Sequence, residues 1–424
     1  MPKAGGAAVV NKLLHLFYLI PILIVTSALG QELPADELQV NISGYFDSFN
    51  VNVIYPSISY TSKVSDNTSI TGRYLVDMIS AASIKGSSGN ATGTGGDDHG
   101  GHDDDIKSLA KTTGTGAVDA VTAASGVGGG GGGSVLGSGF DDVRNEFTLG
   151  ATHLWGGNTI SVNGIYSTER DYTSSTFAGT ISRQFAMKNT TVELGFVRSW
   201  DQVYPVTKNW TRNKDVVTYS ANFSQLLGKN ALIQFLTSYT ENNGYLADAY
   251  NQVTINSGGT ATPYDPIHPD SRIRRAAATQ LKFRLNQTAS MQLGYRYYWD
   301  SWDVNSHTIS GNYMEHLSRH TILSVGLRHY LQSQAYFFKT RYLQPESLMT
   351  TDIKLDKGYS NELQLELILD GGRGQDYLPF LTSEKVQYNL SLNFYQRHTQ
   401  TGYWYNGSQN LFATDFNIGL RYRF

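Results

Sequence analysis

The sequence contains no cysteine among its 424 residues, which excludes disulfides, thiolate zinc sites and cysteine nucleophiles. Proline is scarce, at ten residues, and beyond the N-terminal region no apolar run reaches the ~20 residues that a membrane-spanning helix needs. The formal net charge is only −3, so no strong basic bias points to a nucleic-acid partner. A helical membrane protein is therefore excluded, and nucleic acid is not an expected partner.

Tyrosine is abundant instead, at 27 residues, and aromatic residues make up 12% of the chain. Apolar residues repeatedly alternate with polar ones, as in 363–369, 386–394, 281–286 and 291–299. This two-residue period is typical of strands that place one face against apolar surroundings and the other against water. A polar average with many tyrosines fits strands whose two faces meet lipid and water.

The N-terminal segment resembles an export signal. Lys3 and Lys12 precede the apolar run "LLHLFYLIPILIV" (13–25), and the small residues Ala28 and Gly30 follow it. We therefore expect residues 1–30 to be a signal peptide, removed after Gly30. The alternative is an N-terminal membrane anchor, but the run is short for a span and contains a proline.

Turn signals of two alternating lengths separate the strand-like runs. Short ones lie at 65–68, 155–158, 187–190, 227–230, 286–288 and 318–320, and longer connections lie at 81–142, 170–175, 202–214, 243–275 and 335–358. Short turns on one rim and long loops on the other are typical of an outer-membrane barrel. We predict an all-β fold, a transmembrane antiparallel up-and-down β-barrel of about 16 strands with long extracellular loops, covering residues 31–424. The connection 370–384 is long for the short-turn rim and indicates either a departure or an overlooked hairpin.

The chain ends in the alternating stretch "FNIGLRYRF". We expect it to be the last strand, which pairs with the first so that no edge is left unsatisfied in lipid. Its apolar residues then face lipid, and Tyr422 and Phe424 resemble the C-terminal signal read by the bacterial barrel-assembly machinery. The alternative is the final strand of a soluble sandwich.

The stretches "YPSISYTSKVSDNTSITGRYLVDMISAAS", "DDVRNEFTLGATHLW", "HPDSRIRRAAATQLKFRLNQ" and "LGYRYYWDSWDVNSHTI" resemble a family of Gram-negative outer-membrane proteins catalogued as domain of unknown function 3570. The resemblance covers nearly all of the chain after residue 30. It implies an outer-membrane barrel and an association with an envelope redox system.

The strand phase assigns candidate lumen-lining residues. Those in the second half are mostly basic: Lys282, Arg284, Arg296, Arg328, Glu366, Arg397, Arg421 and Arg423. A basic wall concentrates anions near it. We therefore expect an anion-preferring lumen with few inward acids.

The segment 81–142 is a Gly/Asp-rich loop and a candidate plug for the lumen. Its stretch "GDDHGGHDDD" contains the candidate metal ligands Asp97, Asp98, His99, His102 and Asp103. Carboxylates and imidazoles at this spacing suit a weakly bound divalent cation, and no other cofactor is expected. The alternative is a solvated acidic tract.

Two similar octapeptides, 76–83 and 118–125, lie at the ends of this loop. Each carries an Asp followed three residues later by a hydroxyl: Asp77 with Ser80, and Asp119 with Thr122. We expect these four residues to anchor the loop. A ligand-contact role for the two aspartates is the alternative.

The outer loop 243–275 contains prolines and a cluster of arginines. Arg272, Arg274 and Arg275 could contact lipopolysaccharide, or the segment could be a rigid surface loop. The following stretch "YYWDSWDV" predicts an aromatic girdle at the outer interface, with Asp300 and Asp303 in the adjoining turn. A sugar-binding platform is the alternative.

No spacing of Ser, His and carboxylates singles out a catalytic constellation, so an enzyme is not expected. The sequence predicts a porin-like channel for small solutes in the outer membrane of a Gram-negative bacterium. Its expected partners are outer-membrane lipid, lipopolysaccharide and the assembly machinery. The alternative is a plugged structural or docking barrel of an envelope redox or secretion system, which presents its loops to a periplasmic or surface protein.

Overall fold

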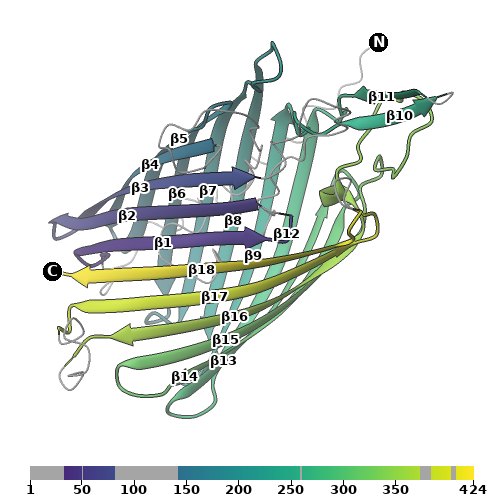
Figure 1. Ribbon diagram of the computed structural model, residues 1–424. Coiled ribbons are helices and arrows are strands. Elements are labelled where there is room, and N and C mark those ends of the chain that lie inside the picture. The colour runs from purple at the N-terminus through teal and green to yellow at the C-terminus, as the bar shows by residue number, and fades with distance from the viewer. Residues whose placement is uncertain (1–32, 50, 82–141, 258–259, 373–382, 403–406) are drawn as a thin grey trace, which may run out of the picture.

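The computed structural model describes residues 33–49, 51–81, 142–257, 260–372, 383–402 and 407–424. Its main feature is a closed antiparallel barrel in which each strand pairs with its neighbours in the chain (Figure 1). The barrel strands are β1 (Glu37–Asp47), β2 (Val51–Ser65), β3 (Thr68–Ala81), β4 (Asp142–Trp155), β5 (Asn158–Thr168), β6 (Tyr172–Phe185), β7 (Thr190–Val203), β8 (Arg212–Leu226), β9 (Ala231–Gly244), β12 (Ser271–Arg284), β13 (Ala289–Asp300), β14 (Asn305–His316), β15 (Thr321–Gln332), β16 (Gly358–Asp370), β17 (Val386–Thr399) and β18 (Asn410–Arg423). The prediction of about 16 strands is confirmed.

The barrel closes between its first and last strands, as predicted. β1 and β18 pair along their length, from Glu37 opposite Arg423 to Asp47 opposite Ala413. Closure satisfies the backbone donors and acceptors of both strands, which is the condition for a sheet in lipid. The alternating stretch that begins at Phe416 therefore belongs to the strand that closes the barrel.

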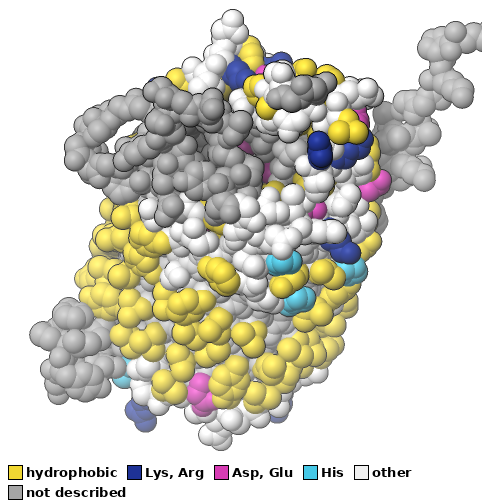
Figure 2. Space-filling view, turned by 45° about the vertical axis from the view of Figure 1, so that its right-hand side comes forward, with side chains coloured by type: hydrophobic (Ala, Val, Ile, Leu, Met, Phe, Trp, Pro, Cys, Tyr) yellow, Lys and Arg dark blue, Asp and Glu magenta, His cyan; other side chains and the backbone are white. Residues whose placement is uncertain are grey.

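The outward face of the wall is apolar. Large side chains on this face are highly exposed, for example Leu149 at 67%, Leu327 at 63% and Ile309 at 60%. The opposite face carries buried polar residues, including Ser199, Gln234 and Thr308. This arrangement is inverted relative to a soluble protein, and Figure 2 shows hydrophobic side chains gathered over the outer wall. Because the shortest barrel strands have 11 residues, every strand is long enough to cross a bilayer, which takes about 9–11.

The two rims differ as the turn signals predicted. On one rim, tight turns join β2 to β3 and β4 to β5, the latter through Gly156 and Gly157, whose φ angles are +52° and +85°. β16 ends and β17 begins on this rim, and residues 373–382 between them lie outside the described residues. β16 pairs directly with β17, so the connection between them does not conceal a barrel hairpin.

The other rim carries the long connections. The loop predicted at 243–275 is shorter, because β9 ends at Gly244 and β12 begins at Ser271. Between them lies a separate hairpin of β10 (Val253–Ser257) and β11 (Thr260–Tyr264). The connection before β16 contains a single 3₁₀ turn, η4 (Ile353–Leu355). The described part of the chain contains no helical segment with the length and hydropathy of a membrane span.

Candidate functional site

The inward face of the wall is the first part of the candidate site. The strand register places all eight predicted lumen-lining residues on the face opposite the exposed hydrophobics. Arg296, for example, lies between Ala278 and Thr308 and is 3% exposed. Their role in lining a solute path stays a prediction.

Some of the inward cations of the second half lie against carboxylates, which the alternation alone did not predict. Arg328 Nε lies 2.9 Å from Glu362 Oε2, and both side chains are almost completely buried. Arg421 Nε lies 3.5 Å from Glu37 Oε2 at the closing seam. Glu362, Gln364 and Glu366 are alternate residues of β16 and therefore share one face, so the alternation alone could have placed Glu362 inward. Asp300, Asp370 and Asp415 lie on the same face.

The first half of the wall carries ion pairs as well. Asp77 on β3 contacts Arg144, its direct partner on β4, and Arg73 lies 3.8 Å from Glu146 on the same two strands. On β7 and β8, Asp201 Oδ2 lies 3.2 Å from Lys214 Nζ, and both side chains are buried. Opposite charges therefore face each other across neighbouring strands around the inner wall.

Asp77 is a wall residue in β3, and the anchor prediction gave no hint of its ion pair with Arg144. Ser80 also lies in β3, although its side chain is outside the described part of the structure. Asp119, Thr122 and the candidate metal ligands Asp97, Asp98, His99, His102 and Asp103 lie outside the described residues. Within the described ranges, no group of three or more His, Asp or Glu residues could hold a metal ion.

The arginines predicted at the outer rim divide between the two faces. Arg272 lies in β12, faces inward, and donates from Nε to Asp300 Oδ2 at 2.8 Å. Its guanidinium also lies 4.2 Å from the ring centre of Trp302. Arg275 faces outward and lies over the ring of Tyr239. The prediction that all three arginines belong to the outer loop was wrong, because β12 begins before them.

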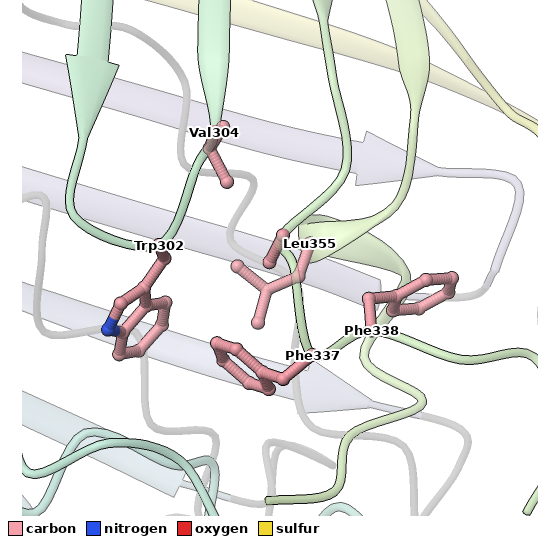
Figure 3. Close-up of a cluster of buried hydrophobic side chains, with 6 residues drawn as sticks. Trp302, Val304, Phe337, Phe338 and Leu355 are labelled. Atoms are coloured by element: carbon pink, nitrogen blue, oxygen red, sulfur yellow. The ribbon is translucent and has the colours of Figure 1, made fainter.

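The predicted aromatic girdle is only partly present in this segment. Tyr297 and Trp299 face outward and stack with ring centres 5.3 Å apart. Trp302 is instead 3% exposed, and its indole donates to the Ser271 carbonyl. It packs in a cluster with Val304, Ala335, Phe337, Phe338 and Leu355 (Figure 3).

This cluster belongs to a set of outer connections that contact one another, which we call the outer collar. The collar consists of the described residues in 169–171, 204–211, 245–270, 301–304, 333–357 and 400–409. A second cluster joins two of its members through Val253, Ile255, Tyr342 and Met349. Tyr342 fixes the longer one, because its hydroxyl donates to the Phe337 carbonyl and accepts from the Thr350 amide.

Polar contacts extend the collar around the rim. The Tyr250 hydroxyl donates to Asp171, which is fully buried in the β5–β6 connection. At the other end, the Thr401 amide donates to Asp356 Oδ2 at 2.6 Å. Among the described residues, contacts therefore link the connections on this rim in sequence from the β5–β6 connection to the β17–β18 connection.

Several titratable groups of the collar have shifted pKa values, among them His268 and Asp248. Burial lowers the pKa of the His268 imidazole, whose ring packs edge-on against Trp302 at 5.4 Å. Burial raises the pKa of the Asp248 carboxyl, although Lys354 and the Tyr250 amide oppose this effect. The protonation of His268 and Asp248 is therefore linked to the folding of the collar.

The comparisons with known proteins agree with the fold. A family described as "Protein of unknown function (DUF3570)" matches residues 24–404. No curated protein matches the sequence. Among solved structures, a bacterial polysaccharide outer membrane secretin has 8% identity and a TM-score of 0.47, with 92% of this chain and 100% of that chain covered.

Two further structures are longer than this chain. CdiB from Acinetobacter baumannii has 8% identity and a TM-score of 0.46, covering 92% of this chain and 61% of that one. The siderophore receptor PirA from Pseudomonas aeruginosa has 8% identity and a TM-score of 0.42, covering 88% and 58%. At these values the likenesses concern overall shape and carry no functional argument.

Proposed function

The chain belongs to the DUF3570 family of proteins of unknown function, and from this premise we propose that it is an outer-membrane channel for small polar solutes in a Gram-negative bacterium. The observation that carries the proposal is the polar, charge-paired inner face of a closed 16-strand barrel. Barrels of 16–18 strands are wide enough to leave an aqueous channel. Residues 1–30 would act as the export signal.

The pairing of the inward charges determines the expected selectivity. An unpaired basic wall would concentrate anions, but Arg328, Arg144 and Lys214 each face a carboxylate. We therefore propose a channel with weak selectivity between anions and cations, in place of the anion preference that the sequence alone predicts.

Planar-bilayer recording of the purified full-length protein tests this function. We expect discrete conductance steps and a small reversal potential in a salt gradient. Loss of residues 1–30 should be visible by mass spectrometry as a mature chain that begins at Gln31, in an outer-membrane fraction. A protein that inserts in the bilayer without conducting would contradict the channel.

The second candidate is a docking barrel whose outer surface binds a protein partner. The outer collar favours it, because ordered loops present a defined surface rather than an open mouth. Deletion of residues 85–117 separates the two. Conductance that appears only after the deletion would identify that segment as a plug. Absence of conductance in both the intact and the deleted protein would favour the docking barrel.

A further inference from the structure

The outward wall of β1–β7 carries an apolar groove with a volume of about 730 Å³. Its lining side chains on the outward face are Leu38, Ile58, Tyr60, Tyr74, Phe147, Leu149, Tyr166, Phe177 and Trp200. Gly72 and Gly164 lie in its floor, and a Cβ at either position would meet nothing within 4 Å. The groove is therefore a hollow in the surface that faces hydrocarbon, between strands that lie side by side in Figure 1.

The course of the groove follows from the strand register. The direct cross-strand neighbours along it are Tyr60, Gly72, Leu149, Gly164 and Phe177, in that order from β2 to β6. Arg198 on β7 continues this line next to the lining residue Trp200. Gly72 is the fifth residue of β3 from the short-turn rim, whereas Arg198 is the ninth residue of β7 from that rim. The groove thus rises across the wall toward the rim with the long connections.

The height of this rise is close to that of a single lipid leaflet. From β3 to β7 the groove crosses four strand spacings, roughly 19 Å. With strands tilted by about 35–45°, the rise is roughly 12 Å, against about 15 Å for half of the hydrocarbon core. An acyl chain from the leaflet on the long-loop side would have this length and direction.

The upper end of the groove carries a positive charge. Arg198 faces Phe177 across β6 and β7, and its guanidinium lies 5.0 Å from the ring centre of Trp200. It pairs with Asp215, which is 3.7 Å away on β8, on the side opposite the groove, and both side chains are about half exposed. A loose, exposed pair of this kind contributes little, so the guanidinium can contact a further anion.

We propose that this groove binds one acyl chain of a phosphorylated lipid from the leaflet on the long-loop side, with the lipid phosphate at Arg198. The apolar walls recognise the chain, Trp200 is of the residue type that settles where hydrocarbon meets headgroups, and Arg198 supplies the complementary charge. Self-association of two barrels through this groove would not require a cation at its end nearer the long-loop rim. The choice of lipid A as the probe rests on the outer-membrane location proposed above, whereas the groove itself depends only on the barrel.

Native mass spectrometry of the delipidated full-length protein with lipid A measures this binding. The groove-filled variant Gly72→Leu/Gly164→Leu should bind at least about tenfold more weakly than the wild type, because the leucines occupy the floor. Gly311→Leu is the matched control, since Gly311 faces outward on β14, away from the groove, and its Cβ would make an ordinary 3.7 Å contact with Leu293. This control should bind lipid A as the wild type does.

Arg198→Gln tests the headgroup contact. It should retain dephosphorylated lipid A unchanged and lose the preference for the phosphorylated form, by about tenfold. Equal lipid binding by the wild type and the groove-filled variant would overturn the proposal. A wild-type dimer that the groove-filled variant abolishes, with lipid binding unchanged, would assign the groove to self-association and overturn it as well.

A second measurement covers the case in which the groove-filled variant fails to fold. Lipids with brominated acyl chains quench nearby tryptophan fluorescence, and the contribution of Trp200 is the difference between the wild type and Trp200→Phe. Saturable quenching of this contribution at low lipid ratio supports the site. Quenching that only rises in proportion to bulk lipid contradicts it, and outer-membrane fractionation reports on the location independently.

Discussion

Arg328 and Glu362 face each other directly across β15 and β16, with Nε and Oε2 2.9 Å apart and both side chains almost completely buried. Each charge is therefore compensated by the other rather than by solvent. Breaking a buried ion pair by removing one of its two charges typically costs about 3–5 kcal/mol.

The first prediction concerns this pair. Glu362→Gln should lower the temperature at which the barrel loses its heat-modifiable gel mobility, and it should shift the reversal potential toward anion preference. The double variant Arg328→Met/Glu362→Met should recover much of the stability, because no charge is left unpaired. An equal stability loss in the single and double variants would contradict this account.

The second prediction concerns which residues of the barrel wall face lipid and which face the lumen. Leu390 faces outward between Leu367 and Ile418, whereas Asn389 faces inward and donates to Glu366 at 2.7 Å. Leu390→Arg near the middle of the membrane should cost about 2–4 kcal/mol. Asn389→Arg should be far milder, since Glu366 can pair with it. Equal folding defects on heat-modifiable gels would show that the two faces are wrongly assigned.

The third prediction concerns assembly. Phe424 is 60% exposed and packs edge-on against Tyr422 and Tyr60 at the short-turn rim. Its deletion should reduce insertion into the outer membrane while leaving export intact, because the closing strand loses its terminal aromatic. Fractionation measures this as a shift toward the periplasm. Normal outer-membrane levels of the deletion variant would refute the role.

The fourth prediction concerns the pH response of the outer collar. Burial lowers the pKa of His268 below its usual value of 6.5. The imidazole is therefore protonated at a higher pH when the collar is loosened than when it is ordered. The collar should therefore lose stability as the pH falls below about 6.5. Hydrogen exchange of residues 245–257 at pH 7.5 and 5.5 measures this, and His268→Phe should remove the response.

Asp248 acts in the opposite direction. Because burial raises its pKa, its charged form is disfavoured in the ordered collar, and that penalty is relieved as the pH falls through the raised value. Asp248→Asn should therefore stabilise the collar at neutral pH and steepen its loss of stability in acid. A collar whose exchange is the same at both pH values in every variant would exclude both effects.

The alternation of residues predicted the faces of the strands, but it could not predict their pairs. A period of two fixes which face a residue occupies, and a shift of two residues between neighbouring strands leaves that face unchanged. The sequence therefore placed Arg328 inward and gave no information on its opposite residue. The ion pair with Glu362 follows from the register, which the alternation leaves open.

The outer collar was missed for a different reason. Its contacts join residues far apart in the chain, such as Ile255 with Tyr342 and Ile267 with Met349, and the connections themselves have no periodicity. Trp302 follows a run of interfacial aromatics, so pattern alone assigned it to the girdle. Its burial depends on Phe337, which arrives from a different connection.

The seam between β1 and β18 also determines when the barrel can be completed. The two partners are the first and the last strand of the barrel, so their hydrogen bonds cannot form until translation has produced β18. Until then, the first strand presents an open edge that invites pairing with other chains. Contacts of such long sequence separation form slowly. The pairing of β1 with β18 is therefore a late step, and the barrel is complete only when β18 has taken its place.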